Sequence, residues 1–227
     1  DEFETVFVEN LKLLTMYPVD EKVNSTVLIN EEDDASINLS KYLGKLEITQ
    51  ARVALPEDYE NVTYFFNGDS RDKIKKCNLY QVEIPCVDTK RQKELHAVAF
   101  TKQVIKCMEK DTEFIVAGLG LVDRIGHTGE MEETVKMLEF LDECIGKIVE
   151  SAALNFYTIV ITSTHGNVEE MYDKEGKTVT THTVNRVPFI MTDSKVQLET
   201  GTLADIAPTI LSYMDISIPE SMRASKV

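Results

Sequence analysis

The apolar residues of this chain alternate between short runs typical of buried strands and longer stretches with helical spacing. The strand candidates are residues 49–55, 62–66, 78–84, 114–117, 157–162 and 187–192. Helical spacing occurs over residues 91–110 and over about six turns beginning near Glu130. A capping-box pattern at residues 202–205 opens a last helix. This alternation predicts an α/β fold, in which a mostly parallel sheet carries helices on both faces.

The first 44 residues follow a different pattern. Two extended segments, residues 4–8 and 11–17, precede a turn at Pro18 and a short apolar run at residues 26–29. A short helix is expected over residues 37–43, stopped by Gly44. We therefore predict two units, a small one over residues 1–44 and a larger one over residues 45–227.

Composition narrows the possible partners. The formal net charge of −15 and the pI near 4.7 argue against binding to nucleic acid or to an anionic membrane. No apolar run is long enough to insert into a bilayer, and the acidic first four residues do not resemble a secretory signal. The four cysteines are widely spaced, which favours reduced thiols, no zinc site, and a cytoplasmic or other intracellular location.

Histidines gather where chemistry is expected in such a fold. Asp123 and His127 follow the strand candidate at residues 114–117, His165 follows the next strand, and His182 precedes the last one. Open α/β sheets place their ligands at strand ends. A single histidine there is more often a hydrogen-bonded structural residue, but three in successive loops rich in Gly, Thr and Asn favour a metal site. Carboxylate and imidazole together suit manganese or zinc.

Other polar residues have simpler interpretations. Glu169, Glu170 and Asp173 are typical of a solvated helix face. His96 lies in the middle of the helix predicted over residues 91–110 and is interpreted as a structural residue.

Five motifs occur in one order and carry a specific resemblance. They are Val62-Thr-Tyr-Phe-Phe-Asn-Gly68, Asp123-Arg-Ile-Gly-His-Thr-Gly129, Thr164-His-Gly-Asn-Val-Glu-Glu-Met171, His182-Thr-Val-Asn-Arg-Val-Pro-Phe189 and Leu203-Ala-Asp-Ile-Ala-Pro-Thr-Ile210. Over residues 45–217 the chain closely resembles the cofactor-independent phosphoglycerate mutases of the alkaline phosphatase superfamily. Residues 4–8 and 11–17 look, more faintly, like the last strands of that family's phosphotransferase domain.

The resemblance implies a particular site. The family interconverts 3- and 2-phosphoglycerate through a phosphoserine, with two manganese ions between its phosphatase and phosphotransferase domains. The ligands of one ion match Asp123, His127 and His182. Of the ligands of the other ion, which include an Asp-His pair, an N-terminal aspartate and the nucleophilic serine, only His165 has a counterpart.

The chain departs from the family pattern at several points. Thr164 stands where the Asp-His pair has its aspartate, and a hydroxyl is a poor manganese ligand. Asp58 stands where a substrate-site lysine is expected. The serine segment and the arginine-rich phosphate-binding segment have no counterpart. Phosphoryl transfer depends on positioning and charge stabilisation, so we expect the activity to be lost and at most one manganese ion to remain.

These observations lead to one expectation and two rivals. We expect a degenerate mutase-like protein, a pseudoenzyme, with a structural or interaction role beside a protein partner in a larger assembly. The first rival is an active manganese-dependent mutase that binds phosphoglycerate and whose remaining segments lie outside this chain. The second is a one-metal binding module that uses Asp123, His127 and His182, in which the ion is structural.

Overall fold

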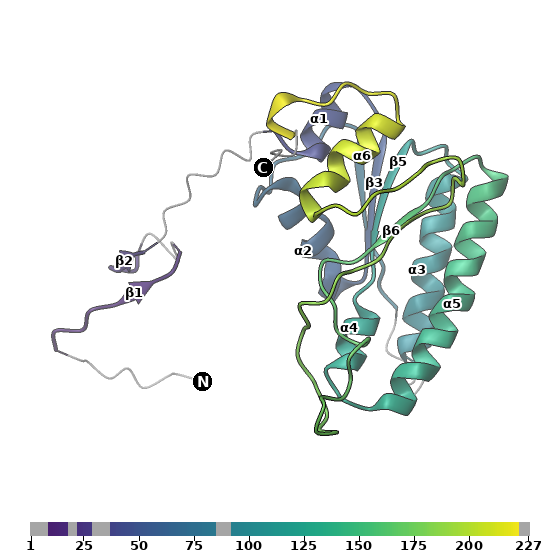
Figure 1. Ribbon diagram of the computed structural model, residues 1–227. Coiled ribbons are helices and arrows are strands. Elements are labelled where there is room, and N and C mark those ends of the chain that lie inside the picture. Colours follow the sequence, from purple (N-terminus) through teal and green to yellow (C-terminus); the bar gives the residue numbers. More distant parts are fainter. Residues whose placement is uncertain (1–8, 18–21, 29–36, 85–91, 223–227) are drawn as a thin grey trace. The chain divides into compact units, whose positions relative to one another are not determined.

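The computed structural model describes residues 9–17, 22–28, 37–84 and 92–222 (Figure 1). Contacts divide the chain into two units, Asp1–Ala35 and Ser36–Val227. In the first unit, β1 (Leu14–Thr15) pairs in parallel with β2 (Thr26–Val27). The extended segment expected at residues 4–8 lies outside the described residues. Helix α1 (Leu39–Lys45), which the sequence pattern grouped with the first unit, belongs to the second by its contacts and runs one residue beyond Gly44.

The second unit has the predicted α/β fold. Its main sheet is parallel, with the strand order β4 (Cys77–Gln81), β3 (Gln50–Ala54) and β5 (Phe114–Gly118). Strands β6 (Val160–Thr162) and β7 (Phe189–Met191) form a separate antiparallel pair. Within the part of the chain that the structure describes, no strand ladder joins this pair to β5.

Helices cover both faces of the parallel sheet, as predicted. Helices α3 (Gln92–Met108) and α5 (Met131–Leu154) lie side by side (Figure 1) and pack on Ala51 and Val53 of β3. A second core joins α1 to α6 (Ile206–Tyr213) through Leu43 and Leu211, both fully buried. Burying a leucine side chain stabilises the fold by roughly 1.5–3 kcal/mol. No helix among the described residues is both long and apolar enough to cross a bilayer.

The central strand β3 is fully buried although it contains two polar residues. Arg52 Nη2 donates to Gln50 Oε1 at 2.7 Å and to Ser40 Oγ at 2.8 Å, and the guanidinium lies 4.9 Å from the centre of the Phe66 ring. Burial lowers the pKa of Arg52. These contacts compensate in part for the burial of the cation, whose Nε has no hydrogen-bond partner among the described residues, and they anchor α1 to the sheet.

One predicted strand is wrong. Residues 62–66 lie at the end of helix α2 (Tyr59–Val62) and in the 3-10 turn Phe65–Asn67. Pro56 opens this helical segment in the first position of a preceding 3-10 turn, where a missing N–H costs nothing. The Thr63 hydroxyl donates to the Tyr59 carbonyl at 2.7 Å and ties the segment into a helical turn. Local hydrogen bonding therefore overrides the strand propensity of valine, tyrosine and phenylalanine.

The remaining predicted elements are found with shifted ends. The segment before His127 is not an open turn but a short helix, α4 (Leu121–Gly126). The capping box at Thr202 is present: its side chain accepts from the Asp205 backbone N–H, and its own backbone N–H donates to the Asp205 carboxylate at 2.7 Å. It begins a 3-10 turn, Leu203–Asp205, that leads into α6.

Candidate metal centre

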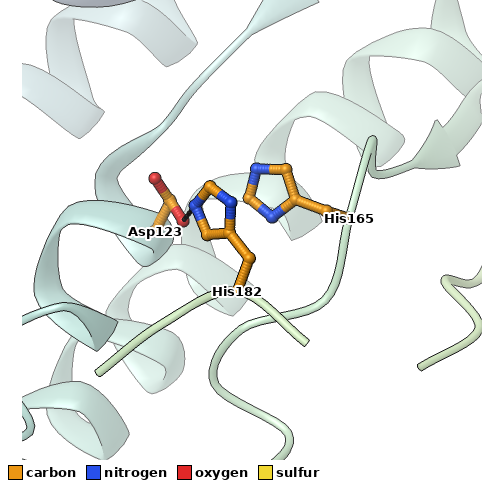
Figure 2. A group of neighbouring side chains, drawn as sticks. All are labelled: Asp123, His165 and His182. Carbon is orange, nitrogen blue, oxygen red and sulfur yellow. Dashed lines mark ion pairs between the residues drawn. The ribbon is translucent and has the colours of Figure 1, made fainter. Parts of the chain in front are cut away.

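The structure brings the four predicted ligands together from three parts of the second unit. Asp123 lies in α4, just after β5, and His127 directly follows that helix. His165 follows β6, and His182 lies in the loop before β7. Figure 2 shows Asp123, His165 and His182 projecting toward one another from separate segments. The remaining histidine, His96, lies half-buried within α3.

Three of these side chains converge at the spacing expected around one ion. Asp123 Oδ1 lies 3.4 Å from His127 Nε2 and 3.2 Å from His182 Nε2, and the two imidazole nitrogens are 3.2 Å apart. Metal–nitrogen and metal–oxygen bonds of about 2.1 Å place neighbouring ligand atoms roughly 3.0–3.4 Å apart in octahedral or tetrahedral geometry. The three atoms therefore fit a single divalent ion.

A backbone carbonyl orients His127 for this task. His127 Nδ1 lies 2.7 Å from the Thr180 carbonyl oxygen, which can only accept a hydrogen bond. Nδ1 therefore carries the proton, and Nε2 presents its lone pair to Asp123 and His182. Metal-binding histidines are commonly fixed in this way by an acceptor on the second ring nitrogen.

His165 is placed differently. The ligand atoms of Asp123, His165 and His182 lie within 4.8 Å of one another, so His165 belongs to the same cluster. Its ring, however, stacks on that of His182 at a centroid distance of 3.6 Å and an interplanar angle of 21°. Lone pairs of nearly parallel rings point along similar directions and do not converge on one point. His127 therefore completes a three-ligand set with Asp123 and His182 better than His165 does.

The Asp123 carboxylate is held in its ionised form. Asn167 Nδ2 donates to Asp123 Oδ1 at 2.6 Å and to the Asp123 carbonyl at 3.2 Å. Burial alone would raise the pKa of Asp123, but the hydrogen bond from Asn167 and the nearby imidazoles keep it below its usual value. A carboxylate that stays charged is ready to bind a cation.

The prediction of a helix at Glu169 is wrong, although the residue is exposed as expected. Residues 167–173 hold a turn at Val168 and Glu169 and an isolated bridge at Tyr172, with no helix. The Glu169 carboxylate accepts hydrogen bonds from the Thr183 hydroxyl, from Asn185 Nδ2 at 3.1 Å and from the Asn167 backbone N–H at 2.7 Å. These bonds, that from Thr183 foremost, lower the pKa of Glu169 from 4.5 to about 2. The only sequence signal was its place four residues after His165 in a loop rich in Gly and Asn.

Asp58 is paired rather than free. Arg124 Nη1 lies 2.7 Å from Asp58 Oδ1 and Nη2 lies 3.3 Å from Oδ2, while the Gly120 N–H donates to Oδ2 at 2.8 Å. The Asp58 side chain is 7% exposed. The negative charge that stands where the family resemblance expects a lysine is thus neutralised by an arginine next to the cluster residue Asp123.

A family comparison agrees with this arrangement. The model of the metalloenzyme superfamily matches residues 10–218, which include all four clustered side chains. The chain belongs to the metalloenzyme superfamily.

Curated relatives of this metalloenzyme-superfamily chain have one name in common. The 2,3-bisphosphoglycerate-independent phosphoglycerate mutase of Antithamnion sp. is 33% identical over 99% of this chain and 45% of its own length. The protein of the same name from Clostridium acetobutylicum is 34% identical over 94% of this chain and 43% of its own length. That from Clostridioides difficile is 39% identical over 81% of this chain and 38% of its own length. The chain thus spans less than half the length of these relatives.

A solved structure supports the fold. A phosphoglycerate mutase of Leishmania mexicana, crystallised at low cobalt concentration, superposes with a TM-score of 0.73 at 23% identity. The match covers 81% of this chain and 38% of the other. The resemblance to phosphoglycerate mutases found in the sequence motifs is confirmed, and so is the α/β fold class.

Proposed function

We propose that this chain is a catalytically inactive derivative of the phosphoglycerate mutases that binds one divalent ion and serves a structural or interaction role. The observation that carries the proposal is the convergence of Asp123, His127 and His182 on one point, beside Thr164 where the family resemblance expects an aspartate. A neutral hydroxyl is a poor ligand for a second ion. The resemblance implies a reaction that needs two ions, so a centre for one ion supports binding without turnover.

The Asp58–Arg124 pair supports the loss of mutase chemistry. Phosphoryl transfer depends on cations that are free to bind and stabilise phosphate oxygens. Here the guanidinium is engaged by a buried carboxylate, and the lysine implied by the resemblance is absent. Arg124 is therefore not free to bind a phosphate group.

We propose manganese as the ion, because two imidazoles and a carboxylate form a donor set that this metal accepts. A bound divalent ion supplies a Lewis acid that polarises phosphoryl oxygens. The test is the metal content of protein purified without chelators, measured by mass spectrometry of the elements. We expect about one manganese per chain, and none in a His127→Ala variant. Equal metal content in the two proteins would contradict the proposal. Zinc found in place of manganese would show that the site binds one ion but that the ion is zinc.

Inactivity is tested by assay. Purified protein is incubated with 3-phosphoglycerate and Mn²⁺, and 2-phosphoglycerate is followed by a coupled enzyme assay. We expect no turnover above that of an Asp123→Ala variant prepared in the same way. Turnover on the order of 1 per second or faster, which is normal for enzymes, would overturn the proposed inactivity.

An active manganese-dependent mutase is the second candidate. The names of the relatives and the converging Asp123, His127 and His182 favour it. This function requires further segments, because the chain spans 45% of the length of the Antithamnion protein. The intact mass of the native polypeptide, measured together with its activity on 3-phosphoglycerate, separates the two candidates. A native chain about twice as long that interconverts the phosphoglycerates would establish the enzyme.

A protein partner or larger assembly is proposed from the first unit. Its strands β1 and β2 have two residues each, and an isolated two-stranded sheet is marginal in water. Large apolar side chains of this unit are exposed, among them Leu11, Leu14 and Leu28. Light scattering of the native protein tests the assembly. A mass above that of one chain is expected, and a monomer at micromolar concentration would contradict it.

A cytoplasmic location is proposed from the thiols. Cys77, Cys107 and Cys144 are free, as expected in a reducing compartment. Cell fractionation with an antibody to the protein tests this proposal. Recovery with secreted or organelle-lumen markers would argue against it.

A further inference from the structure

Glu169 connects the loop that carries His165 to the loop that carries His182. Its Oε1 accepts hydrogen bonds from the hydroxyl of Thr183, the residue after His182, and from Asn185 Nδ2 at 3.1 Å. Its Oε2 accepts from a backbone N–H in its own loop at 2.7 Å. One carboxylate therefore makes hydrogen bonds to both loops that carry cluster histidines.

The same hydrogen-bond chain continues through Asn167 to the Asp123 carboxylate. The backbone N–H of Asn167 is the group that Glu169 Oε2 binds, and the Asn167 side chain donates to Asp123 Oδ1 at 2.6 Å. Asn167 is 8% exposed. Fixing its backbone therefore fixes the direction from which its amide reaches Asp123.

The backbone of the two loops is in contact at the same place. The Thr183 N–H donates to the Gly166 carbonyl at 3.0 Å and forms an isolated bridge between the loops. A side chain at position 166 would overlap the Glu169 carboxylate and the Thr183 hydroxyl. The glycine is therefore required by the closeness of these groups, and the loops have little freedom to shift.

We propose that Glu169 is a positioning residue that holds Asp123 and His182 at coordinating distance by tying their supporting loops together. The inference rests on the proposed function, because it takes Asp123, His127 and His182 as the ligands. Both oxygens of Glu169 are occupied by hydrogen bonds, so the residue acts through its neighbours and is not itself a ligand. Groups in this outer layer typically change metal affinity by 10- to 100-fold when they are removed.

The first arm of the test measures metal binding. Mn²⁺ is titrated calorimetrically into wild type, Glu169→Ala, Glu169→Gln and the control Glu175→Ala. Glu175 is exposed and carries the same charge, and within the described chain its carboxylate makes no hydrogen bond or ion pair. We expect the Kd for Mn²⁺ to rise about tenfold or more in Glu169→Ala and to stay unchanged in Glu175→Ala.

The glutamine variant separates geometry from charge. Glutamine keeps an oxygen for the Asn167 N–H and can donate its amide to the Thr183 hydroxyl. It loses the bond from Asn185 Nδ2, which keeps its bond to Glu170 Oε2 at 3.0 Å. Its Kd for Mn²⁺ is therefore expected within about threefold of wild type, a small part of the loss in Glu169→Ala. Visible absorption of bound Co²⁺ gives a second readout, in which Glu169→Ala shifts the band positions. Equal weakening in Glu169→Gln and Glu169→Ala would overturn positioning in favour of simple charge attraction.

The second arm needs no metal. Hydrogen exchange of the metal-free proteins is followed in residues 163–170 and 181–185, with α5 as internal reference. Glu169→Ala is expected to exchange faster in both loops and at the normal rate in α5. Unchanged exchange in the loops, or a Mn²⁺ affinity in Glu169→Ala equal to that of Glu175→Ala, overturns the inference. Failure of wild type to bind Mn²⁺ refutes the proposed function instead. The exchange data then still test whether Glu169 ties the two loops together.

Discussion

Asp58 and Arg124 are 66 residues apart in sequence and form a two-pronged ion pair, with nitrogen–oxygen distances of 2.7 and 3.3 Å. The pair joins the N-terminus of α2 to α4, the helix that carries Asp123. A fork-to-fork contact of this kind fixes orientation as well as distance. The position that the family resemblance assigns to substrate binding thus serves here to hold the helix that carries Asp123.

Removing Arg124 should destabilise the protein. Arg124→Ala leaves the Asp58 carboxylate buried with the Gly120 N–H as its remaining donor. We expect the free energy of unfolding to fall by about 2 kcal/mol, toward the low end for buried pairs because the Arg124 side chain is 34% exposed. Urea unfolding measures the change. Arg124→Lys should lie between wild type and alanine, and a loss in Arg124→Ala below about 0.5 kcal/mol would show that the pair is not stabilising.

Manganese should raise the melting temperature of the wild type. An ion that binds the folded protein at 100 times its Kd stabilises it by about 2.7 kcal/mol. His127→Ala removes one of three ligands and should abolish most of the shift. His96→Ala is the matched control, because His96 lies within α3. Thermal melts with and without MnCl₂ give the comparison, and an equal shift in His127→Ala and wild type would exclude His127 as a ligand.

Acid should weaken the contribution of Glu169 to stability. Hydrogen bonding lowers its pKa from 4.5 in the unfolded chain to about 2 in the fold. A group with a depressed folded-state pKa contributes fully above its unfolded value, and the contribution disappears as the pH falls toward the folded value. The advantage of wild type over Glu169→Gln in free energy of unfolding should be constant above about pH 5 and narrow between 4.5 and 2. A difference that does not vary over this range would contradict the assignment.

The buried guanidinium of Arg52 should tolerate an apolar replacement better than truncation. Arg52→Ala leaves a cavity and unpaired acceptors on Gln50 and Ser40, so we expect a loss of about 3 kcal/mol. Arg52→Met leaves the same acceptors unpaired but fills much of the volume, so it should cost about 2 kcal/mol, less than the alanine variant. Chemical unfolding of both variants checks the order. A methionine variant less stable than the alanine variant would be inconsistent with it.

The sequence predicts the strands and helices in which apolar residues recur at regular spacing. Strands β3 and β5 and helices α3 and α5 are found at nearly the expected residues, because apolar spacing reports which face is covered. Residues 62–66 are an exception, since the hydrogen bonds of the turn that begins at Pro56 outweigh their strand propensity. The pattern also did not indicate that β6 and β7 would pair antiparallel.

The sequence indicated the candidate ligands but not the residues that hold them in place. Histidines beside small and polar residues at strand ends are visible in the sequence. In the structure, His182 Nε2 lies 3.2 Å from Asp123 Oδ1 and 3.2 Å from His127 Nε2. Glu169 and Arg124 were not visible as site residues, because their partners lie 14 and 66 residues away. Acidic and basic residues at the surface of a chain are usually solvated, and pairing across such separations depends on the fold.

The cluster lies where the backbone has no continuous ladder. Asp123 follows the three-stranded sheet, whereas His165 and His182 flank the β6–β7 pair, and within the described chain no strand bonds connect the two. An ion bound by the proposed ligands would add a link between these two parts to the side-chain bonds that already join them, such as that from Asn167 to Asp123. Its extraction lowers the cost of local opening in residues 160–191 while β4, β3 and β5 stay intact. If the proposed ion binds, its removal should therefore place the first protease cleavage site in this C-terminal half.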